Sequence, residues 1–447
     1  MSKDNSKALF VLPEEVEAFT RRDFLETGVS LTAAVSLSSL LTPGMAKAAD
    51  FKVQRRLVWV NMSGGWDILE VMDPKGASTS GITIPYAGTD LHDLSGSNRG
   101  DKLGRWLPNI AARGADVIVV RGLSMGTSSH QAGSVYMDTG ILSNTGNVNA
   151  ASVPAIVGSE SAATIPVIQL NGGTMPQIDR GLLKPTSVVR AENLALYRSL
   201  YPTTDDQTAR SLRLLDYMKN SITRVKDTAG TNDRLKAIDA AQSKIRGQIE
   251  SKLAGKLALT ADDTKAFKRT ATPGQQMGQD QSSTWALAAK LLTNNLVTCI
   301  TLGINGFDTH AGQDTRLKPI LEGFDFYMSA FIDYLKSQNA FDNTLIVCYS
   351  DFGRTPKING SAGRDHWPIG GALLIGGGLE GGRSVGQTDD NLMPMVVNST
   401  TGQPDPSGLS LNPTHLNGSV LKLTLGADYM KYRSYLTAID ALTKLKG

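Results

Sequence analysis

The side chains of this chain best suited to chemistry near neutral pH are its histidines, which also bind divalent metals. The five histidines are His92, His130, His310, His366 and His415. Two of them stand beside aspartates in turn-rich segments, Asp308-Thr309-His310 and Asp365-His366. Carboxylate oxygens and imidazole nitrogens together suit zinc or another divalent ion. We therefore hypothesise a shared polar or metal site that includes these segments.

Two further aspartates follow apolar runs. Asp67 comes after Ser63-Gly64-Gly65, and Asp351 lies in Ser350-Asp351-Phe352-Gly353-Arg354. A single aspartate in such a place is more often a helix cap or a turn residue. Four acidic loop positions with two histidines are hard to explain by capping alone. The candidate metal ligands are Asp67, Asp308, His310, Asp351 and His366.

The residues before these positions predict the elements that must hold them. Five apolar runs are typical of buried strands, and each is followed by Gly, Ser or Asp. They are residues 57–60, 117–120, 297–303, 345–349 and 372–375. Helical patterns precede the third and fourth runs, which indicates a doubly wound α/β sheet covered by helices. Because parallel strands end at one edge of a sheet, we expect the candidate ligands to converge there.

A more polar, helical stretch interrupts this alternation between residues 191 and 281. Apolar residues recur within it at spacings that keep to one helical face. We interpret it as a helical insertion or cap within a single α/β domain that spans residues 49–447. The end of the chain from Ser419 is also predicted to be helical.

The first 48 residues have the three parts of an export signal. Arg21-Arg22 precede an uncharged stretch from Gly28 to Leu41, and Ala46-Lys47-Ala48 follows at the spacing of a cleavage site. Paired arginines mark the twin-arginine version, which predicts passage through the twin-arginine translocase and a periplasmic or secreted mature protein. The alternative is an anchoring N-terminal helix. No later segment has enough consecutive apolar residues to span a bilayer.

Charge and cysteine content exclude several classes of protein. The net charge of the whole chain is +3, and removing residues 1–48, whose net charge is −1, leaves +4. A balance this close to neutral gives no reason to expect nucleic acid as a partner. Two cysteines, Cys299 and Cys348, rule out a disulfide scaffold. Both lie in apolar runs and are interpreted as core residues, although a bridge would form if those runs were neighbouring strands.

Several motifs together resemble one family. Four motifs occur along the chain in this order: Ser63-Gly64-Gly65-Trp66-Asp67, Gly306-Phe307-Asp308-Thr309-His310, Asp351-Phe352-Gly353-Arg354-Thr355-Pro356 and Gly363-Arg364-Asp365-His366-Trp367-Pro368. On these motifs the chain is identified as a member of the DUF1501 family of exported bacterial proteins. That family in turn resembles the alkaline phosphatase and sulfatase superfamily. The resemblance implies a three-layer alkaline-phosphatase-like fold, with a central, mostly parallel sheet and helices on both faces.

The resemblance also implies roles for individual residues. Asp67 matches an Asp ligand that occurs early in the superfamily's sequences, and His366 matches a His ligand that occurs late. Asp308 and His310 match an Asp…His pair, although their spacing is shortened. Asp351 matches the first member of an Asp-His pair, but Phe352 stands where the His would be. Phe352 therefore counts against a full two-metal site, whose ions clamp the attacking and leaving oxygens. It leaves one ion held by some of the five candidate ligands.

The nucleophile is a second departure from the superfamily pattern. The segment that ends in Thr139-Gly140 places His130 where a nucleophilic Ser, Thr or Cys would stand. One interpretation has Ser128 or Ser129 as nucleophile with His130 as base or ligand. The other has His130 in the polar site with no nucleophile. Arg354 and Arg364 are placed to bind a phosphate, sulfate or carboxylate, and salt bridges are an equal alternative.

Two function hypotheses follow. The first is a metal-dependent hydrolase of phosphate or sulfate esters, with an anionic small-molecule ester as substrate. Its ion would be zinc, calcium or magnesium, and its catalytic candidates are Ser128, Ser129, His130 and Arg354. The second is a non-catalytic member of the same fold that acts as a periplasmic or envelope binding or assembly protein.

Overall fold

The computed structural model of the chain describes most of its length after the N-terminal segment. It covers residues 53–76, 81–174, 188–190, 198–199, 201–230, 233–270, 278–431 and 434–446. The twin-arginine motif lies outside these residues, so export remains a prediction. Among the described residues, no helix combines the length and apolar character that a membrane crossing requires.

A single eight-stranded sheet forms the centre of the α/β unit, in the order β12-β4-β11-β8-β1-β7-β5-β6. β11 runs antiparallel to its neighbours β4 and β8, and the other pairs are parallel. The predicted mostly parallel sheet is therefore confirmed. Its strands are β1 (Arg56–Ser63), β4 (Val117–Ser124), β5 (Ile165–Leu170), β6 (Val188–Arg190), β7 (Val297–Asn305), β8 (Thr344–Tyr349), β11 (Ile369–Gly376) and β12 (Arg383–Val385).

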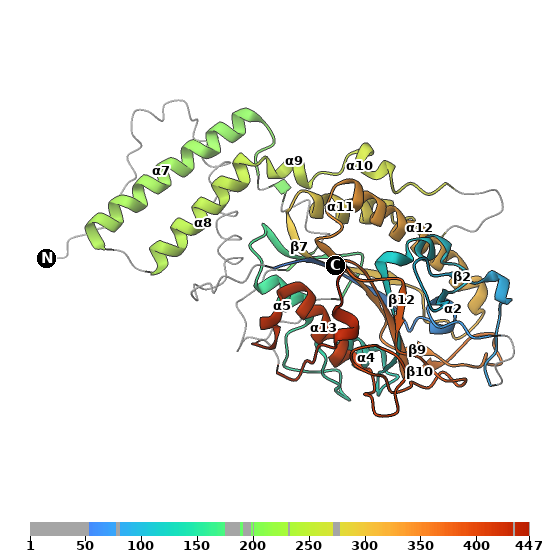
Figure 1. Cartoon of the computed structure of the whole chain (residues 1–447). Coiled ribbons are helices and arrows are strands. Elements are labelled where there is room, and N and C mark those ends of the chain that lie inside the picture. The colour runs from blue at the N-terminus through green and yellow to red at the C-terminus, as the bar shows by residue number, and fades with distance from the viewer. Residues whose placement is uncertain are drawn as a thin grey trace. The chain divides into compact units, whose positions relative to one another are not determined.

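Helices cover both faces of this sheet (Figure 1). On one side, α4 (His130–Thr139), α5 (Val153–Ser159) and α13 (Pro413–Leu425) share an apolar core with Trp59 and Val347 of the strands. On the other side lie α11 (Ser282–Thr293) and α12 (Gln313–Ser337), and α3 (Pro108–Ala112) packs against α12. Because both faces are covered, the central strands β1 and β8 are buried without polar alternation. The three-layer α/β architecture is confirmed.

Short elements complete the edge of the sheet that bears the candidate ligands. α2 (Ile68–Val71) follows the turn after β1, and the two-stranded pair β9 (Gly353–Arg354) and β10 (His366–Trp367) follows β8. His366 pairs with Arg354 across this small ribbon. The ribbon therefore brings the FGRTP and GRDHWP motifs side by side.

The predicted helical insertion contains a compact unit at Ala195–Gly255. Its helices α7 (Asp205–Ala229) and α8 (Asp233–Glu250) pack along each other (Figure 1). α7 begins with a capping box, in which Thr204 Oγ1 accepts from the Gln207 backbone and the Gln207 side chain accepts from the Thr204 backbone. The chain then continues through α9 (Leu253–Leu257) and α10 (Ala261–Lys265).

The two cysteines lie on strands that flank β1 rather than each other. Leu57 of β1 is opposite Cys299 of β7, and Val60 is opposite Cys348 of β8. Two strand spacings separate them by about 9–10 Å, whereas a disulfide needs Cα atoms within about 7 Å. Both thiols are free and buried, and burial raises the pKa of each. The interpretation as core residues is confirmed, and a bridge is excluded.

Candidate metal centre

The candidate site lies at the carboxyl ends of β1, β7 and β8, and the turn after β1 ties two of these ends together. The backbone N–H of Gly65 donates to Asp351 Oδ1 (2.6 Å) and to Ser350 Oγ (3.0 Å). Gly64 and Gly65 have φ values of +114° and +78°, which only glycine adopts easily. A Cβ on Gly65 would lie 2.7 Å from the ring of Phe352. This turn therefore requires glycine for both its conformation and its close packing.

The loop after β7 presents Asp308 and His310 to the site. Phe307 and Thr309 are fully buried, whereas Asp308 and His310 alternate with them and remain about half exposed. The buried guanidinium of Arg354 fixes Asp308, because its Nη2 donates to Asp308 Oδ1 (2.5 Å) while its Nε donates to the Gly65 carbonyl (2.9 Å). Arg354 thus links the turn after β1 to the loop after β7.

Three imidazole rings surround one oxygen of Asp308. The distances from Asp308 Oδ1 to Nε2 are 3.1 Å for His310, 3.4 Å for His366 and 3.7 Å for His130. The Nε2 atoms of His310 and His366 are themselves 3.0 Å apart. Ligand atoms of His130, Asp308 and His366 all lie within 4.8 Å of one another. The structure therefore brings Asp308, His310 and His366 together, and adds His130 to them.

Each ring is held by its other nitrogen, which identifies the nitrogen left for the site. His366 Nδ1 donates to the carbonyl of Ser128 (2.8 Å), which can only accept. His310 Nδ1 donates to Asp365 (2.8 Å), and His130 Nδ1 donates to Asp351 Oδ2 (2.5 Å). An outer carboxylate or carbonyl on one nitrogen, with the other directed inward, is the usual arrangement of metal-binding histidines.

The electrostatics of the cluster suit a cation. Burial acts to raise the pKa of Asp308, but the hydrogen bond and charge of Arg354 outweigh it and lower that pKa. Burial lowers the pKa of His366 and so favours the neutral ring. The hydrogen bond to Asp351 raises the pKa of His130. A deprotonated carboxylate and a neutral imidazole are the forms that bind metals.

The spacing of the inner atoms also fits a tetrahedral ion. With bonds of about 2.0–2.1 Å, the ligand atoms of such an ion lie about 3.3–3.4 Å apart. The separations among Asp308, His310 and His366 are 3.0, 3.1 and 3.4 Å. Calcium and magnesium prefer oxygen ligands, whereas imidazole suits zinc and other transition metals. The donor set therefore favours zinc among the three ions expected from the sequence.

Asp67, the fourth candidate ligand at this edge, has other partners. Its side chain is fully buried, and Oδ1 caps α2 by accepting from the Leu69 backbone (2.9 Å). Oδ2 accepts from the Gln313 side chain and lies 3.0 Å from Arg364 Nε. The structure thus places Asp67 in a cap and a buried ion pair, and not among the three histidines. Asp351 does not join the inner atoms either, because it accepts from the outer nitrogen of His130, Nδ1.

The two arginines of the motifs are wholly buried. Arg354 Nη1 donates to the carbonyl of Arg364 (3.0 Å), and Arg364 donates to the carbonyls of Thr355, Pro356 and Thr83. Both side chains are 0% exposed. Their guanidinium groups therefore hold the loops of the site together through hydrogen bonds and ion pairs, which is the salt-bridge alternative. Neither guanidinium is exposed to solvent, where it could bind an anion. Arg354 positions Asp308 and the turn after β1, and a catalytic role for it stays a prediction.

Ser128 and Ser129 precede α4 in an exposed segment. Ser129 is the N-cap residue of α4, yet its side chain makes no capping bond, and Ser128 contacts the cluster through its backbone carbonyl. Within the described residues, no hydrogen bond joins either hydroxyl to His130. The role of either serine as a nucleophile stays a prediction.

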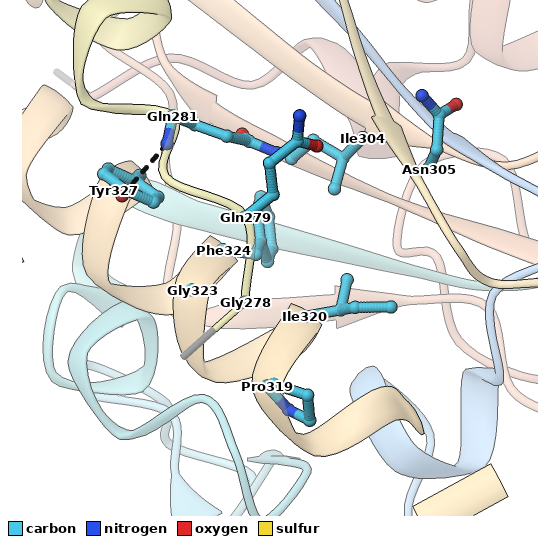
Figure 2. A pocket seen from close by; sticks show the side chains of 10 residues that line it. All are labelled: Gly278, Gln279, Gln281, Ile304, Asn305, Pro319, Ile320, Gly323, Phe324 and Tyr327. Carbon is cyan, nitrogen blue, oxygen red and sulfur yellow. Dashed lines mark hydrogen bonds between the residues drawn. The ribbon is translucent and has the colours of Figure 1, made fainter. Parts of the chain in front are cut away.

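A small cavity of about 40 Å³ lies elsewhere in the α/β unit, between α12, the end of β7 and residues 278–281 (Figure 2). The hydroxyl of Tyr327 accepts from the Gln281 backbone across it (3.1 Å). That volume holds about one water molecule, and the lining contains no histidine or carboxylate. The histidine cluster is therefore the stronger candidate site. The lining residues are Gly278, Gln279, Gln281, Ile304, Asn305, Pro319, Ile320, Gly323, Phe324 and Tyr327.

Comparison with known proteins gives one family match. The model of the family described as "Protein of unknown function (DUF1501)" matches residues 54–403. No curated protein sequence matches the chain significantly.

Solved structures resemble the chain only distantly. The soluble domain of lipooligosaccharide phosphoethanolamine transferase A from Neisseria meningitidis is 11% identical, with 92% of this chain and 98% of that chain covered and a TM-score of 0.38. A protein in the alkaline phosphatase superfamily from Vibrio parahaemolyticus is 10% identical, with coverage of 94% and 79% and a TM-score of 0.38. The lipoteichoic acid synthase from Listeria monocytogenes is 11% identical, with coverage of 92% and 81% and a TM-score of 0.35. Similarity at this level leaves function to be inferred from the site's own residues.

Proposed function

The chain belongs to the DUF1501 family, and from that premise we propose that it is a metal-dependent hydrolase of phosphate or sulfate esters. The observation that carries the proposal is the arrangement around Asp308. Three rings, each anchored through Nδ1, direct Nε2 at one carboxylate oxygen from 3.1 to 3.7 Å. The resemblance of its motifs to the phosphatase and sulfatase superfamily supports the choice of substrate class.

Asp308, His310 and His366 are the proposed ligands, because their separations fit a tetrahedral ion. Three protein ligands leave one coordination position for water or substrate, as catalytic zinc sites require. When bound, the ion polarises the ester oxygen and stabilises the charge that develops on it. Asp365 and the Ser128 carbonyl hold two of the rings in the tautomer that leaves Nε2 free.

We propose that His130 transfers the proton that ester hydrolysis requires. Its Nδ1 donates to the buried carboxylate of Asp351, which the Gly65 N–H and the Ser350 hydroxyl also hold. A buried aspartate that orients a histidine is the pairing used in general acid–base catalysis. His130 Nε2 faces Asp308, and 40% of its side chain is exposed. It can therefore exchange protons with solvent and with a bound ester.

We also propose that the protein works outside the cytoplasm after twin-arginine export. Arg21-Arg22 and the uncharged stretch that follows support this. That route carries folded chains, which suits a protein that acquires its ion before it crosses the membrane. Replacing Arg21-Arg22 with Lys-Lys should retain the protein in the cytoplasm, as fractionation would show. Unchanged export would contradict the proposal.

A non-catalytic binding role is the second candidate, and one observation favours it. Arg354 and Arg364 are fully buried, so neither guanidinium is open to solvent, where it could clamp an anionic ester. In this account the same cluster binds a structural ion in an envelope protein.

Turnover separates the two candidates. The purified mature protein would be assayed with p-nitrophenyl phosphate and p-nitrophenyl sulfate, with and without chelator and added Zn²⁺. The enzyme account predicts metal-dependent release of p-nitrophenol that Asp308→Ala abolishes and Asp93→Ala, an exposed control, leaves intact. Metal binding without turnover of any ester would favour the binding protein.

A further inference from the structure

We infer that the site holds one divalent ion rather than two, because groups of the chain itself occupy both acidic residues that a second ion would need: an arginine pairs with Asp67, and hydrogen-bond donors hold Asp351. The inference rests on the proposed function and sharpens it. The superfamily resemblance implies Asp67 and Asp351 as further ligands, and the structure shows what each of them binds instead.

Asp67 is already neutralised by an arginine. Its Oδ2 lies 3.0 Å from Arg364 Nε, and both side chains are 0% exposed. The same oxygen accepts from Gln313, while Oδ1 accepts from the Leu69 backbone at 2.9 Å. Both carboxylate oxygens are therefore engaged, and an incoming ion would have to displace a buried guanidinium.

Arg364 has no freedom to move aside. Its Nη1 donates to the carbonyls of Thr355 (2.7 Å) and Pro356 (2.5 Å), and its Nη2 donates to Thr83 (2.6 Å). Removing the guanidinium from Asp67 would strand a buried charge and leave these carbonyls without their donor, which is costly. Arg364 is thus a fixed internal cation in the place of a metal.

Asp351 is also engaged, by hydrogen-bond donors rather than by an arginine. Oδ1 accepts from the Gly65 N–H (2.6 Å) and from the Ser350 hydroxyl (2.8 Å), and Oδ2 accepts from His130 Nδ1 (2.5 Å). Its side chain is 3% exposed. An ion at Asp351 would therefore have to compete with these donors at a side chain that is almost fully buried.

Phe352 fills the remaining ligand position of the superfamily pattern. Its ring is fully buried and packs 4.7 Å from the ring of His130 and 4.5 Å from that of His366, measured between centroids. An apolar ring therefore stands where the superfamily pattern has a nitrogen ligand. Asp308 is also paired with a buried arginine, because its Oδ1 accepts from Arg354 Nη2 (2.5 Å). It differs from Asp67 and Asp351 in that its side chain is 51% exposed and faces three imidazole nitrogens, so an ion can reach it without displacing Arg354.

Metal stoichiometry tests the inference without any assay of activity. The mature protein would be saturated with Zn²⁺, passed through a desalting column and measured by plasma mass spectrometry against protein concentration. We expect about one zinc per chain in the wild type and in Asp67→Asn, and less than a tenth of that in Asp308→Asn. Thermal unfolding would verify that each variant is folded, and X-ray absorption of the wild type should show no metal–metal distance.

Each other outcome has a distinct meaning. Two zinc ions per wild-type chain, or a metal–metal vector, would overturn the single-ion inference and leave the proposed hydrolase standing. Loss of zinc in folded Asp67→Asn would overturn it as well, because Asp67 would then be a ligand. No bound zinc in the wild type would overturn both the inference and the metal-dependent function.

Discussion

The Nε2 atoms of His310 and His366 lie 3.0 Å apart, although the Nδ1 atom of each ring already donates to an outer acceptor. Two neutral rings held in that tautomer direct lone pairs at each other. Such lone pairs repel unless a proton or a metal ion lies between them. Asp308 Oδ1, 3.1 and 3.4 Å from the same two atoms, adds a negative charge to that position. The three atoms therefore define the place where we expect a cation to bind.

Neutralising Asp308 should nearly abolish metal binding. Asp308→Asn removes the only carboxylate among the inner atoms, and we expect the affinity for Zn²⁺ to fall by more than the roughly 10–100-fold typical of outer-shell changes. Competition with a chromogenic chelator measures this affinity. Asp93→Asn is the matched control, because Asp93 is an exposed aspartate paired with Lys102. Equal affinity in both variants would contradict the assignment.

Asp365 should matter through His310 rather than by touching the ion. In Asp365→Asn, the amide N–H₂ can face His310 Nδ1 and favour the tautomer that protonates Nε2. We expect Zn²⁺ affinity to fall about 10–100-fold with little change in thermal stability, since Asp365 is exposed. An Asp365→Ala variant with unchanged zinc affinity would argue against an anchoring role.

The buried pair of Asp67 and Arg364 should show strong energetic coupling. Arg364→Met leaves the Asp67 carboxylate buried without its cation, and we expect a loss of about 3–5 kcal/mol in the free energy of unfolding. Asp67→Asn added to this variant removes the stranded charge, so part of the loss should be recovered. Urea unfolding of the two single variants and the double variant measures the coupling. Additive effects would show that the pair contributes little as a pair.

A second buried carboxylate, outside the site, predicts a pH dependence of stability. Asp138 on α4 is fully buried, which raises its pKa to about 6, although Trp59, Tyr349 and Thr174 all donate to its Oδ1. Its folded pKa lies above the usual aspartate pKa of 3.8. The stability that this group contributes is therefore full below about pH 4 and is lost as the pH rises through about 6.

Asp138→Asn should remove that dependence, because the amide oxygen can accept the same three hydrogen bonds without ionising. Relative to the variant, the wild type should lose about 2–3 kcal/mol of stability between pH 4 and pH 7. Thermal unfolding of both proteins across this range measures the difference. Parallel stability curves would mean that Asp138 does not titrate there.

Much of the sheet could be predicted from apolar runs, because strands buried on both faces carry few polar residues. β1, β4, β7, β8 and β11 all coincide with predicted runs. β6 and β12 have three residues each, too few for a pattern, and β5 contains Pro166 and Gln169, which interrupt its apolar character. These three strands were missed for that reason.

The candidate site, too, could be predicted only in part from the sequence. Asp308, His310 and His366 lie in short motifs after strands, so their convergence could be expected from topology. The partners of Asp67 and Asp351 could not, because Arg364 and His130 are far away in the chain; His130 and Asp351 are 221 positions apart. Local spacing carries no signal for such pairs. Asp365 was visible beside His366, but its role as the anchor of His310 depends on a loop-to-loop contact.

A crystal structure of the Zn²⁺-saturated protein, with anomalous data collected at the zinc edge, tests the central claim most directly. We predict a single anomalous peak about 2 Å from Asp308 Oδ1, His310 Nε2 and His366 Nε2, and none beside Asp67. The absence of a peak at the three histidines, or a peak coordinated by Asp67, would contradict the account.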